Sequence, residues 1–94
     1  MKTGDVSNVD VVMQIGKAFQ KYRAEKRWSE QELAAEIIKK GLEKISYAQI
    51  LKIEKADKAP TISTIMILCD VLDITLNELF DEAQIIARRR RART

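Results

Sequence analysis

The sequence contains no histidine, a single cysteine, a single proline and only three glycines among its 94 residues. The lone Cys69 has no second cysteine for an intrachain disulfide, and without histidine the usual zinc ligand sets and imidazole bases are missing. The glycines are scattered, so they build no phosphate-cradling loop, and no nucleophile lies beside a base. We therefore expect no metal, no cofactor and no enzymatic activity.

A long apolar run is also missing, and the first ten residues lack the basic-then-apolar layout of a secretory signal. These two absences predict no membrane segment and a soluble cytoplasmic protein. Hydrophobic residues make up 46% of the chain and charged residues 33%, a balance that favours a folded chain over disorder. A chain of this length fits one domain with one core.

The net charge of +3 depends on the C-terminal end of the chain. Five arginines lie there: Arg88, Arg89, Arg90, Arg91 and Arg93. Taking their five charges from the net +3 leaves −2 for the remaining residues, so the body of the protein is not basic. The arginine run is open to two interpretations, a segment that attracts nucleic acid or a solvated end without a partner.

The spacing of apolar residues predicts helices throughout the chain. Val12, Ile15, Phe19 and Tyr22 follow the 3-4-3 spacing of one helical face, which predicts a first helix over Val9 to Lys26. Three later helices each begin with a capping box, in which two side chains satisfy free backbone amides of the first turn. The boxes pair Ser29 with Glu32, Ser46 with Gln49, and Thr75 with Glu78.

Glycine and proline mark where these helices end. Gly41 can take the left-handed conformation that closes the second helix, and the third helix is expected to end near Lys55. After Pro60, Thr61 can cap a strongly apolar fourth helix that runs to Leu72 and forms the centre of the core. The apolar stripe of the last helix consists of Leu76, Leu79, Phe80, Ala83 and Ile86.

The resulting prediction is an all-α, compact five-helix bundle with short connections. We expect a flexible N-terminal segment over residues 1–8, a helical domain over 9–87 and a basic tail over 88–94. No internal repeat or second domain is apparent.

Three segments, in one order, resemble the lambda-repressor-like (Cro and phage-repressor, XRE) helix-turn-helix family: IGKAFQKYRAEKRWSEQELAAE, SYAQILKIEKADKAP and TISTIMILCDVLDITLNELF. The resemblance covers Ile15 to Phe80. The matching positions are Ile15-Gly16, Arg23, Ser29, Leu33-Ala34, Ser46, Ile50, Ile53-Glu54, Pro60 and Leu72 to Leu79. Their order, rather than any single match, makes the resemblance specific.

The resemblance implies that the third helix, Tyr47 to Ile53, lies in the major groove of DNA. Tyr47, Ala48 and Lys52 match the base-contacting positions, and Gln49 lies beside them. Gln pairs with adenine, Lys donates to guanine, and Ala contacts a thymine methyl. Additional DNA-binding residues, with Ser46 placed to bind phosphate, are Ser46, Gln31, Lys55 and Lys58. The alternative is an ordinary polar helix face, which remains open for Gln49 and Lys52.

The resemblance also implies that Arg23 and Glu54 form an internal ion pair joining the first helix to the end of the third. This pair is architectural rather than catalytic, because a partly buried arginine and carboxylate fix orientation through two parallel hydrogen bonds. Trp28, just before the second helix, is expected to be a core residue rather than a ligand platform.

The chain departs from the family pattern in several places. The segment from Ala34 to Glu54 is several residues longer than usual, which predicts a longer second helix and a lengthened connection to the third. Glu30 stands where the family often has a phosphate-binding Gln, and Ala56 stands where a Gly commonly follows the Glu. Asp57 occupies a position that is often basic, and Leu51 is unusually apolar for an exposed position.

These observations together favour a sequence-specific, double-stranded DNA-binding transcriptional regulator, predicted to be a repressor that acts as a homodimer. Phe80, Ala83 and Ile86 are the candidates for the interface between two copies. Packing within the chain is the alternative for Phe80. The alternative function is a protein-protein interaction module on a helix-turn-helix fold that has lost its DNA contacts.

Overall fold

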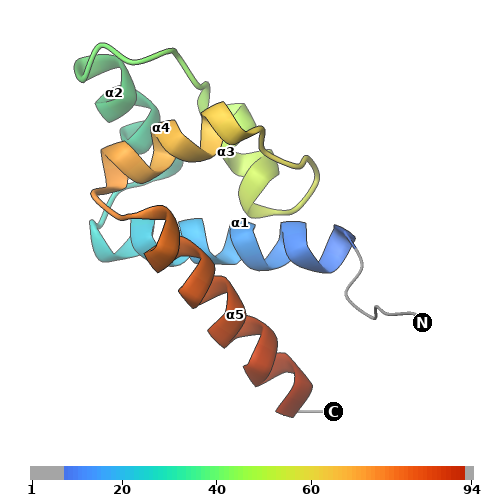
Figure 1. The fold of residues 1–94 in the computed structure, drawn as a ribbon. Coiled ribbons are helices and arrows are strands. Elements are labelled where there is room, and N and C mark those ends of the chain that lie inside the picture. Colours follow the sequence, from blue (N-terminus) through green and yellow to red (C-terminus); the bar gives the residue numbers. More distant parts are fainter. Residues whose placement is uncertain (1–7, 93–94) are drawn as a thin grey trace.

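The computed structural model describes the backbone of residues 8–92 and the side chains of residues 10–89 (Figure 1). It contains α1 (Asn8–Glu25), α2 (Glu30–Lys39), α3 (Tyr47–Glu54), α4 (Ile62–Leu72) and α5 (Leu76–Ala92). No strand occurs within residues 8–92. The prediction of an all-α five-helix fold is therefore confirmed.

The predicted capping boxes set the first turns of α2, α3 and α5. At α2, the Ser29 hydroxyl accepts from the Glu32 amide at 3.1 Å, and the Glu32 carboxylate accepts from the Ser29 amide at 2.8 Å. Ser46 with Gln49, and Thr75 with Glu78, repeat this exchange. Thr61 caps α4 by accepting from the Thr64 amide at 3.2 Å. Local sequence thus fixes where these helices begin.

Four helices end with a residue in the left-handed conformation. Gly41, as predicted, has a φ of 74° after α2. The other three positions lack glycine: Arg27, Ala56 and Asp73 have φ angles of 62°, 63° and 60°. At each end, the amide of the following residue donates to a carbonyl five residues back, which satisfies a free acceptor of the last turn.

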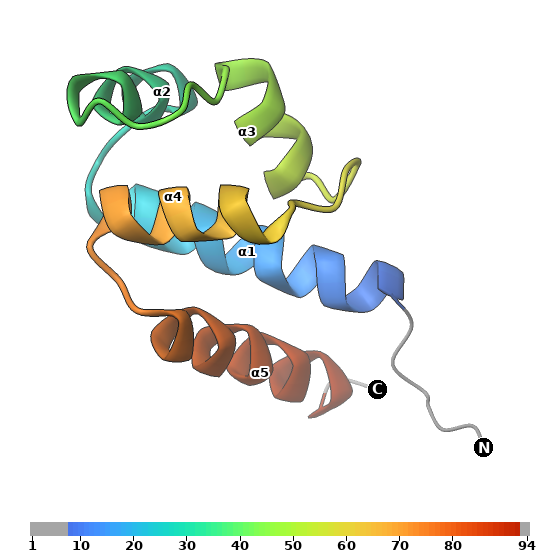
Figure 2. The ribbon, with the colours of Figure 1, turned by 45° about the horizontal axis from the view of Figure 1, so that its top comes forward.

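Helix α1 is the centre of the arrangement, since it contacts α3, α4 and α5. Figures 1 and 2 show α3 and α5 on opposite sides of α1, while α2 packs against α3 and α4. The largest fully buried side chains come from all five helices: Phe19, Leu33, Ile37, Ile50, Leu68, Leu72 and Leu79. Trp28 packs against this core, as expected. One core therefore holds the five helices together.

The connection between α2 and α3 is long, as predicted, and comprises residues 40–46. Leu42 packs against the core, and Ile45 is 4% exposed. The connection is therefore anchored at two points by apolar side chains.

Helix α5 packs along α1 through both apolar and polar contacts. Lys21 pairs with Glu82 at 2.8 Å, and the Tyr22 hydroxyl donates to the Glu78 carbonyl at 3.3 Å. The helix continues past Ala87 to Ala92 without a break. Residues 88–92 of the predicted basic tail are thus helical and continue α5. Residues 93–94 lie outside the described residues. The segment 1–8, predicted to be flexible, also lies outside them except for Asn8, where α1 begins.

Over residues 8–92, no helix combines the length and the apolar character needed to cross a membrane. The same part of the chain contains no cluster of acidic or sulfur ligands that could hold a metal ion. Cys69 is a buried core residue, and burial raises the pKa of its thiol above the ordinary value.

Gly16 is the point where α1 comes closest to the C-terminal end of α3. A Cβ at this position would clash with the carbonyl oxygen of Ile53 and would lie 3.2 Å from that of Glu54. Both obstacles are backbone atoms of a helix, so they cannot move aside as a flexible side chain can. Any side chain at residue 16 therefore forces the two helices apart.

We expect Gly16→Ala to lower the free energy of unfolding by about 1–3 kcal/mol or more, because it overpacks a helix contact. Urea unfolding followed by circular dichroism measures the change. Gln20→Ala is the matched control on α1, since Gln20 is exposed, and it should change stability by less than about 0.5 kcal/mol. Equal stability of wild type and Gly16→Ala would contradict the close approach.

Ala56 tests the left-handed helix ends. The left-handed conformation destabilises a residue with a Cβ by about 1–2 kcal/mol. Glycine has no such steric cost, although it loses more backbone entropy on folding. Ala56→Gly should therefore raise the free energy of unfolding by about 0.5–1 kcal/mol in the same assay. Ala59→Gly, in the same loop but at a residue without positive φ, should lower it. A loss of stability in Ala56→Gly would refute this account.

Candidate nucleic-acid interface

Helix α3 presents one face to solvent and buries the other. Ile50, Ile53 and Glu54 are buried on its inner side. The outward face, which we call the reading face, consists of Tyr47, Ala48, Leu51, Lys52 and Lys55. These side chains share one side of the helix because residues three and four apart are neighbours on a helix. Leu51 is half-buried, and the other four are exposed.

An ion pair between Arg23 and Glu54 fixes the C-terminal end of α3 to α1. The guanidinium donates from Nε to Oε2 of Glu54 at 2.6 Å and from Nη2 to Oε1 at 2.9 Å. A third bond, from Nη1 to the Trp28 carbonyl at 2.6 Å, ties the pair to the start of α2. The Glu54 side chain is 3% exposed. The pair is therefore bidentate and almost fully buried, which holds α3 in a single orientation.

Glu30 is a second carboxylate in this network. Its Oε2 lies 3.3 Å from Nη2 of Arg23, so one arginine faces two acids. Burial raises the pKa of Glu54 above the ordinary value, Arg23 opposes this shift, and Glu30 adds to it. The pKa of Glu30 is lowered, chiefly by its own backbone amide, with the charges of Arg23 and Lys55 contributing. At neutral pH Glu30 therefore carries a negative charge at the first turn of α2.

Ser46 and Gln49, both predicted to touch DNA, form hydrogen bonds with each other at the start of α3. The Gln49 amide oxygen accepts from the Ser46 backbone amide at 2.9 Å and from the Ser46 hydroxyl at 3.2 Å. That hydroxyl also accepts from the Gln49 backbone amide. The Gln49 oxygen is therefore occupied while the cap is closed, which leaves the amide nitrogen of Gln49 for other contacts. The Ser46 hydroxyl can turn its hydrogen toward a phosphate without breaking the cap, because the cap uses this hydroxyl only as an acceptor from the Gln49 amide.

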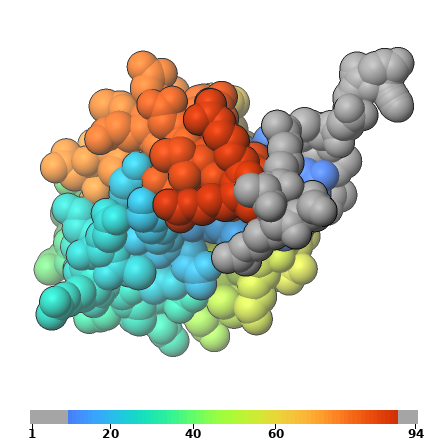
Figure 3. Space-filling model, turned by 90° about the horizontal axis from the view of Figure 1, so that it is seen from below, coloured from blue at the N-terminus to red at the C-terminus, as the bar shows by residue number. Residues whose placement is uncertain are grey.

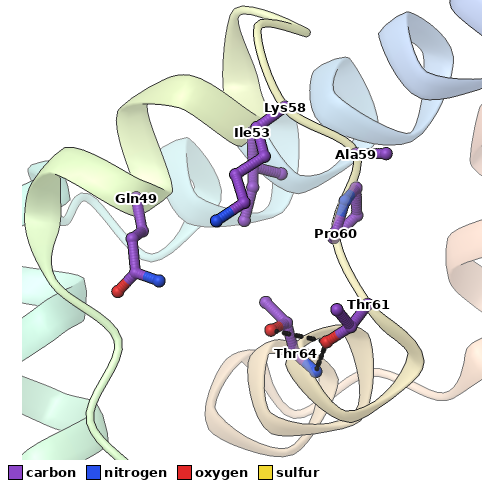
Figure 4. A pocket seen from close by; sticks show the side chains of 7 residues that line it. All are labelled: Gln49, Ile53, Lys58, Ala59, Pro60, Thr61 and Thr64. Atoms are coloured by element: carbon purple, nitrogen blue, oxygen red, sulfur yellow. Dashed lines mark hydrogen bonds between the residues drawn. The ribbon is translucent and has the colours of Figure 1, made fainter.

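A small hollow lies between α3 and the first turn of α4. Its lining residues are Gln49, Ile53, Lys58, Ala59, Pro60, Thr61 and Thr64. Figure 4 shows the Gln49 and Lys58 side chains pointing toward the space between the two helices. Thr61 accepts from Thr64 on the other side of the hollow. The loop after α3 thus brings Lys58 close to the first turn of α4.

The remaining predicted DNA-contacting residues lie on accessible parts of the same helices. Gln31 is exposed on α2, Lys55 is the C-cap of α3, and Lys52 is exposed on its last turn. Asp57 is also exposed in the loop, so one negative charge lies among the three lysines there. The structure thus gathers Lys52, Lys55 and Lys58 around the end of α3.

The residues predicted for an interface between two copies lie on α5 and differ in exposure. Phe80 is 41% exposed, Ala83 is 7% exposed, and Ile86 packs against the core. Ala83 and Ile86 are thus used within the chain itself, because their stripe continues the contact with α1. Leu76, one turn before Phe80, is 39% exposed.

Sequence reasoning missed two features of this region. Glu30 was identified only as a departure from the family, and its pairing with Arg23 depends on how the turn after α1 folds back. Thr61 was predicted only to cap the fourth helix, although it also lines the hollow together with Thr64. A capping residue gives no sequence signal for this second position.

Comparison with known proteins agrees with this geometry. A family model described as helix-turn-helix, of the lambda-repressor-like (XRE) type, matches residues 19–79, which is more than half of the chain. Searches of curated proteins and of solved structures give no match. The matched region contains the last turns of α1, all of α2 to α4 and the start of α5. The chain therefore belongs to the lambda-repressor-like helix-turn-helix family of DNA-binding transcription regulators.

Proposed function

We propose that the protein binds specific sequences of double-stranded DNA as a homodimer, with α3 in the major groove, and acts as a transcriptional repressor. The observation that carries this proposal is the exposed reading face of α3, with its two lysines and Lys58 nearby, held in one orientation by the buried pair of Arg23 and Glu54. A helix docks in a major groove with its first residues at the base edges. Tyr47 and Ala48 occupy that end of α3.

The lysines supply the sequence-independent part of binding. Lys52, Lys55 and Lys58 are exposed, and in the described part of the chain none of them forms an ion pair with a carboxylate. Each lysine that neutralises a phosphate releases condensed counterions, so affinity falls as salt rises. Gln31 on α2 extends the proposed contacts along the DNA backbone.

Pairing of two copies is proposed through the exposed part of α5. Figure 3 views the face on which α4 and α5 lie next to each other. Leu76 and Phe80 are one helical turn apart on α5, and each keeps more than a third of its surface exposed. A two-fold contact through Phe80 would double the DNA site, which a single small module needs for specificity. The proposed interface therefore centres on Phe80, with Ala83 and Ile86 supporting it from within the chain.

A second candidate function is a protein-protein interaction module. The Glu30 carboxylate, fixed by Arg23 at the start of α2, favours it because a negative charge at that turn repels phosphate. Leu51 and Tyr47 give α3 an apolar component that a protein partner could cover. Stable binding to another protein, with no duplex binding at low salt, would establish this function instead.

The charge of Glu30 allows a direct test of where DNA lies. Glu30→Gln removes one negative charge while keeping an oxygen that can accept from Arg23. Duplex affinity should rise about threefold to fivefold at low salt, and the gain should shrink as salt screens the charge. Fluorescence anisotropy with labelled duplex at several salt concentrations measures both effects.

Asp81→Asn is the matched control, because it makes the same charge change at an exposed position of α5. An equal gain in both variants would mean that only net charge matters. An unchanged or weaker affinity of Glu30→Gln, in a variant with wild-type thermal stability, would place the DNA away from the first turn of α2.

Selection of bound duplexes from a random pool tests the proposed function as a whole. The full chain should enrich an inverted repeat, since two copies related by a two-fold axis read two half-sites. A chain ending at Ala87 should enrich the same half-site with a shallower salt dependence. Four of the arginines removed, Arg88 to Arg91, belong to the end of α5, which packs on the opposite side of α1 from α3 (Figure 2), so the half-site preference should stay with α3.

Phe80→Ser separates recognition of the half-site from pairing of the two copies. It should keep the half-site preference but lose the inverted repeat, because Phe80 is exposed in the single chain. Binding by the full chain without enrichment, lost on truncation at Ala87, would show that the arginines, and not α3, bind the DNA.

A further inference from the structure

The reading face of α3 contains an unusual set of chemical groups for contact with base edges. Tyr47, Leu51 and Lys55 follow one another at i, i+4 spacing, and Ala48 and Lys52 form the neighbouring row. Tyr47 is 45% exposed, and Leu51 is half-buried. The N-terminal half of the face is therefore apolar, and its C-terminal half carries two ammonium groups.

The side chains that would pair with adenine or cytosine are missing from this face. Asn and Gln read adenine through both groups of the amide, and Asp and Glu accept from the cytosine amino group. The nearest amide, that of Gln49, already uses its oxygen to accept from the Ser46 amide at 2.9 Å. The Glu30 and Glu54 carboxylates pair with Arg23, and Asp57 lies in the loop after α3 rather than on the face. The face can thus offer ammonium donors, the Tyr47 hydroxyl and apolar surface.

We propose that α3 recognises its half-site through the methyl groups of thymines, with Tyr47, Ala48 and Leu51 in contact with them. This inference rests on the proposed function and names the base feature that it reads. A thymine methyl is the apolar group that the major groove presents, and apolar side chains distinguish thymine by covering it. Lys52 and Lys55 flank these contacts and donate to guanine or to phosphate.

Lys52 and Lys55 favour DNA over an apolar protein as the partner that covers the reading face. A purely hydrophobic partner would leave the ammonium groups of Lys52 and Lys55 at the interface without acceptors, which is costly. The major groove of a thymine-rich site presents methyl groups between two rows of phosphates. Its pattern of apolar groups beside negative charge matches the pattern of apolar groups beside lysines on α3.

The test compares thymine with uracil in the enriched duplex, using the full chain. Uracil keeps every base-pairing group of thymine and removes only the methyl. Each thymine in the half-site is replaced in turn, and the dissociation constant is measured by anisotropy. Losing a buried methyl should weaken binding about fourfold at each contacted position. Uracil outside the half-site should leave the affinity unchanged.

A second variant assigns the contact to a side chain. Leu51→Ala keeps a strong helix former at this position, and its fold is checked by thermal unfolding. In this variant, the loss caused by uracil should disappear at one thymine and persist at the others. The comparison is made within each variant, so it does not depend on the overall affinity of Leu51→Ala.

The outcomes separate the inference from the proposed function. An enriched site that tolerates uracil at every position would overturn thymine-methyl recognition while leaving sequence-specific binding in place. Full uracil losses at every thymine in Leu51→Ala would likewise overturn the assignment to Leu51. A selection that enriches no duplex would overturn the proposed function and this inference together.

Discussion

The junction between α1 and the C-terminal end of α3 is the contact on which the rest of the interface depends. Gly16 lets the two helices approach until only a hydrogen fits between them, and Arg23 then reaches the buried Glu54 carboxylate with two hydrogen bonds. Removing one partner of such a pair strands the other charge, at a cost of about 3–5 kcal/mol where burial is deep. Close packing and charge pairing thus specify the same orientation of α3, because each is lost if the helix turns.

This junction also determines the electrostatics of the interface. Arg23 binds Glu30 as well as Glu54, so its positive charge is used inside the protein and is not offered to DNA. Glu30 lies in the first turn of α2, where it neutralises the positive end of the helix dipole. In the proposed complex, the attraction for phosphate therefore falls to Lys52, Lys55 and Lys58 at the end of α3, rather than to the first turn of α2.

Sequence predicted the helices well because their starts carry local signals. The capping pairs at Ser29, Ser46 and Thr75 and the left-handed Gly41 are all present in the structure. The other left-handed helix ends were not predicted, since Arg27, Ala56 and Asp73 lack the glycine that signals this conformation. The helical domain was predicted to end at Ala87, where the apolar stripe gives way to the arginines of the basic tail. Arginine is nevertheless a good helix former, and α5 continues through the run.

The candidate site was harder to predict from sequence than the fold, and Gln49 shows why. Glutamine is favoured at the third position of a capping box and is also the residue that pairs with adenine, so one residue type satisfies two patterns. Only the hydrogen bonds of the folded helix show that its oxygen is used for the cap. Once Gln49 is assigned to the cap, Leu51 is no longer an oddity of the sequence. It lies between Tyr47 and Lys55 on the exposed side of α3, where an apolar side chain can meet the apolar groups of the major groove.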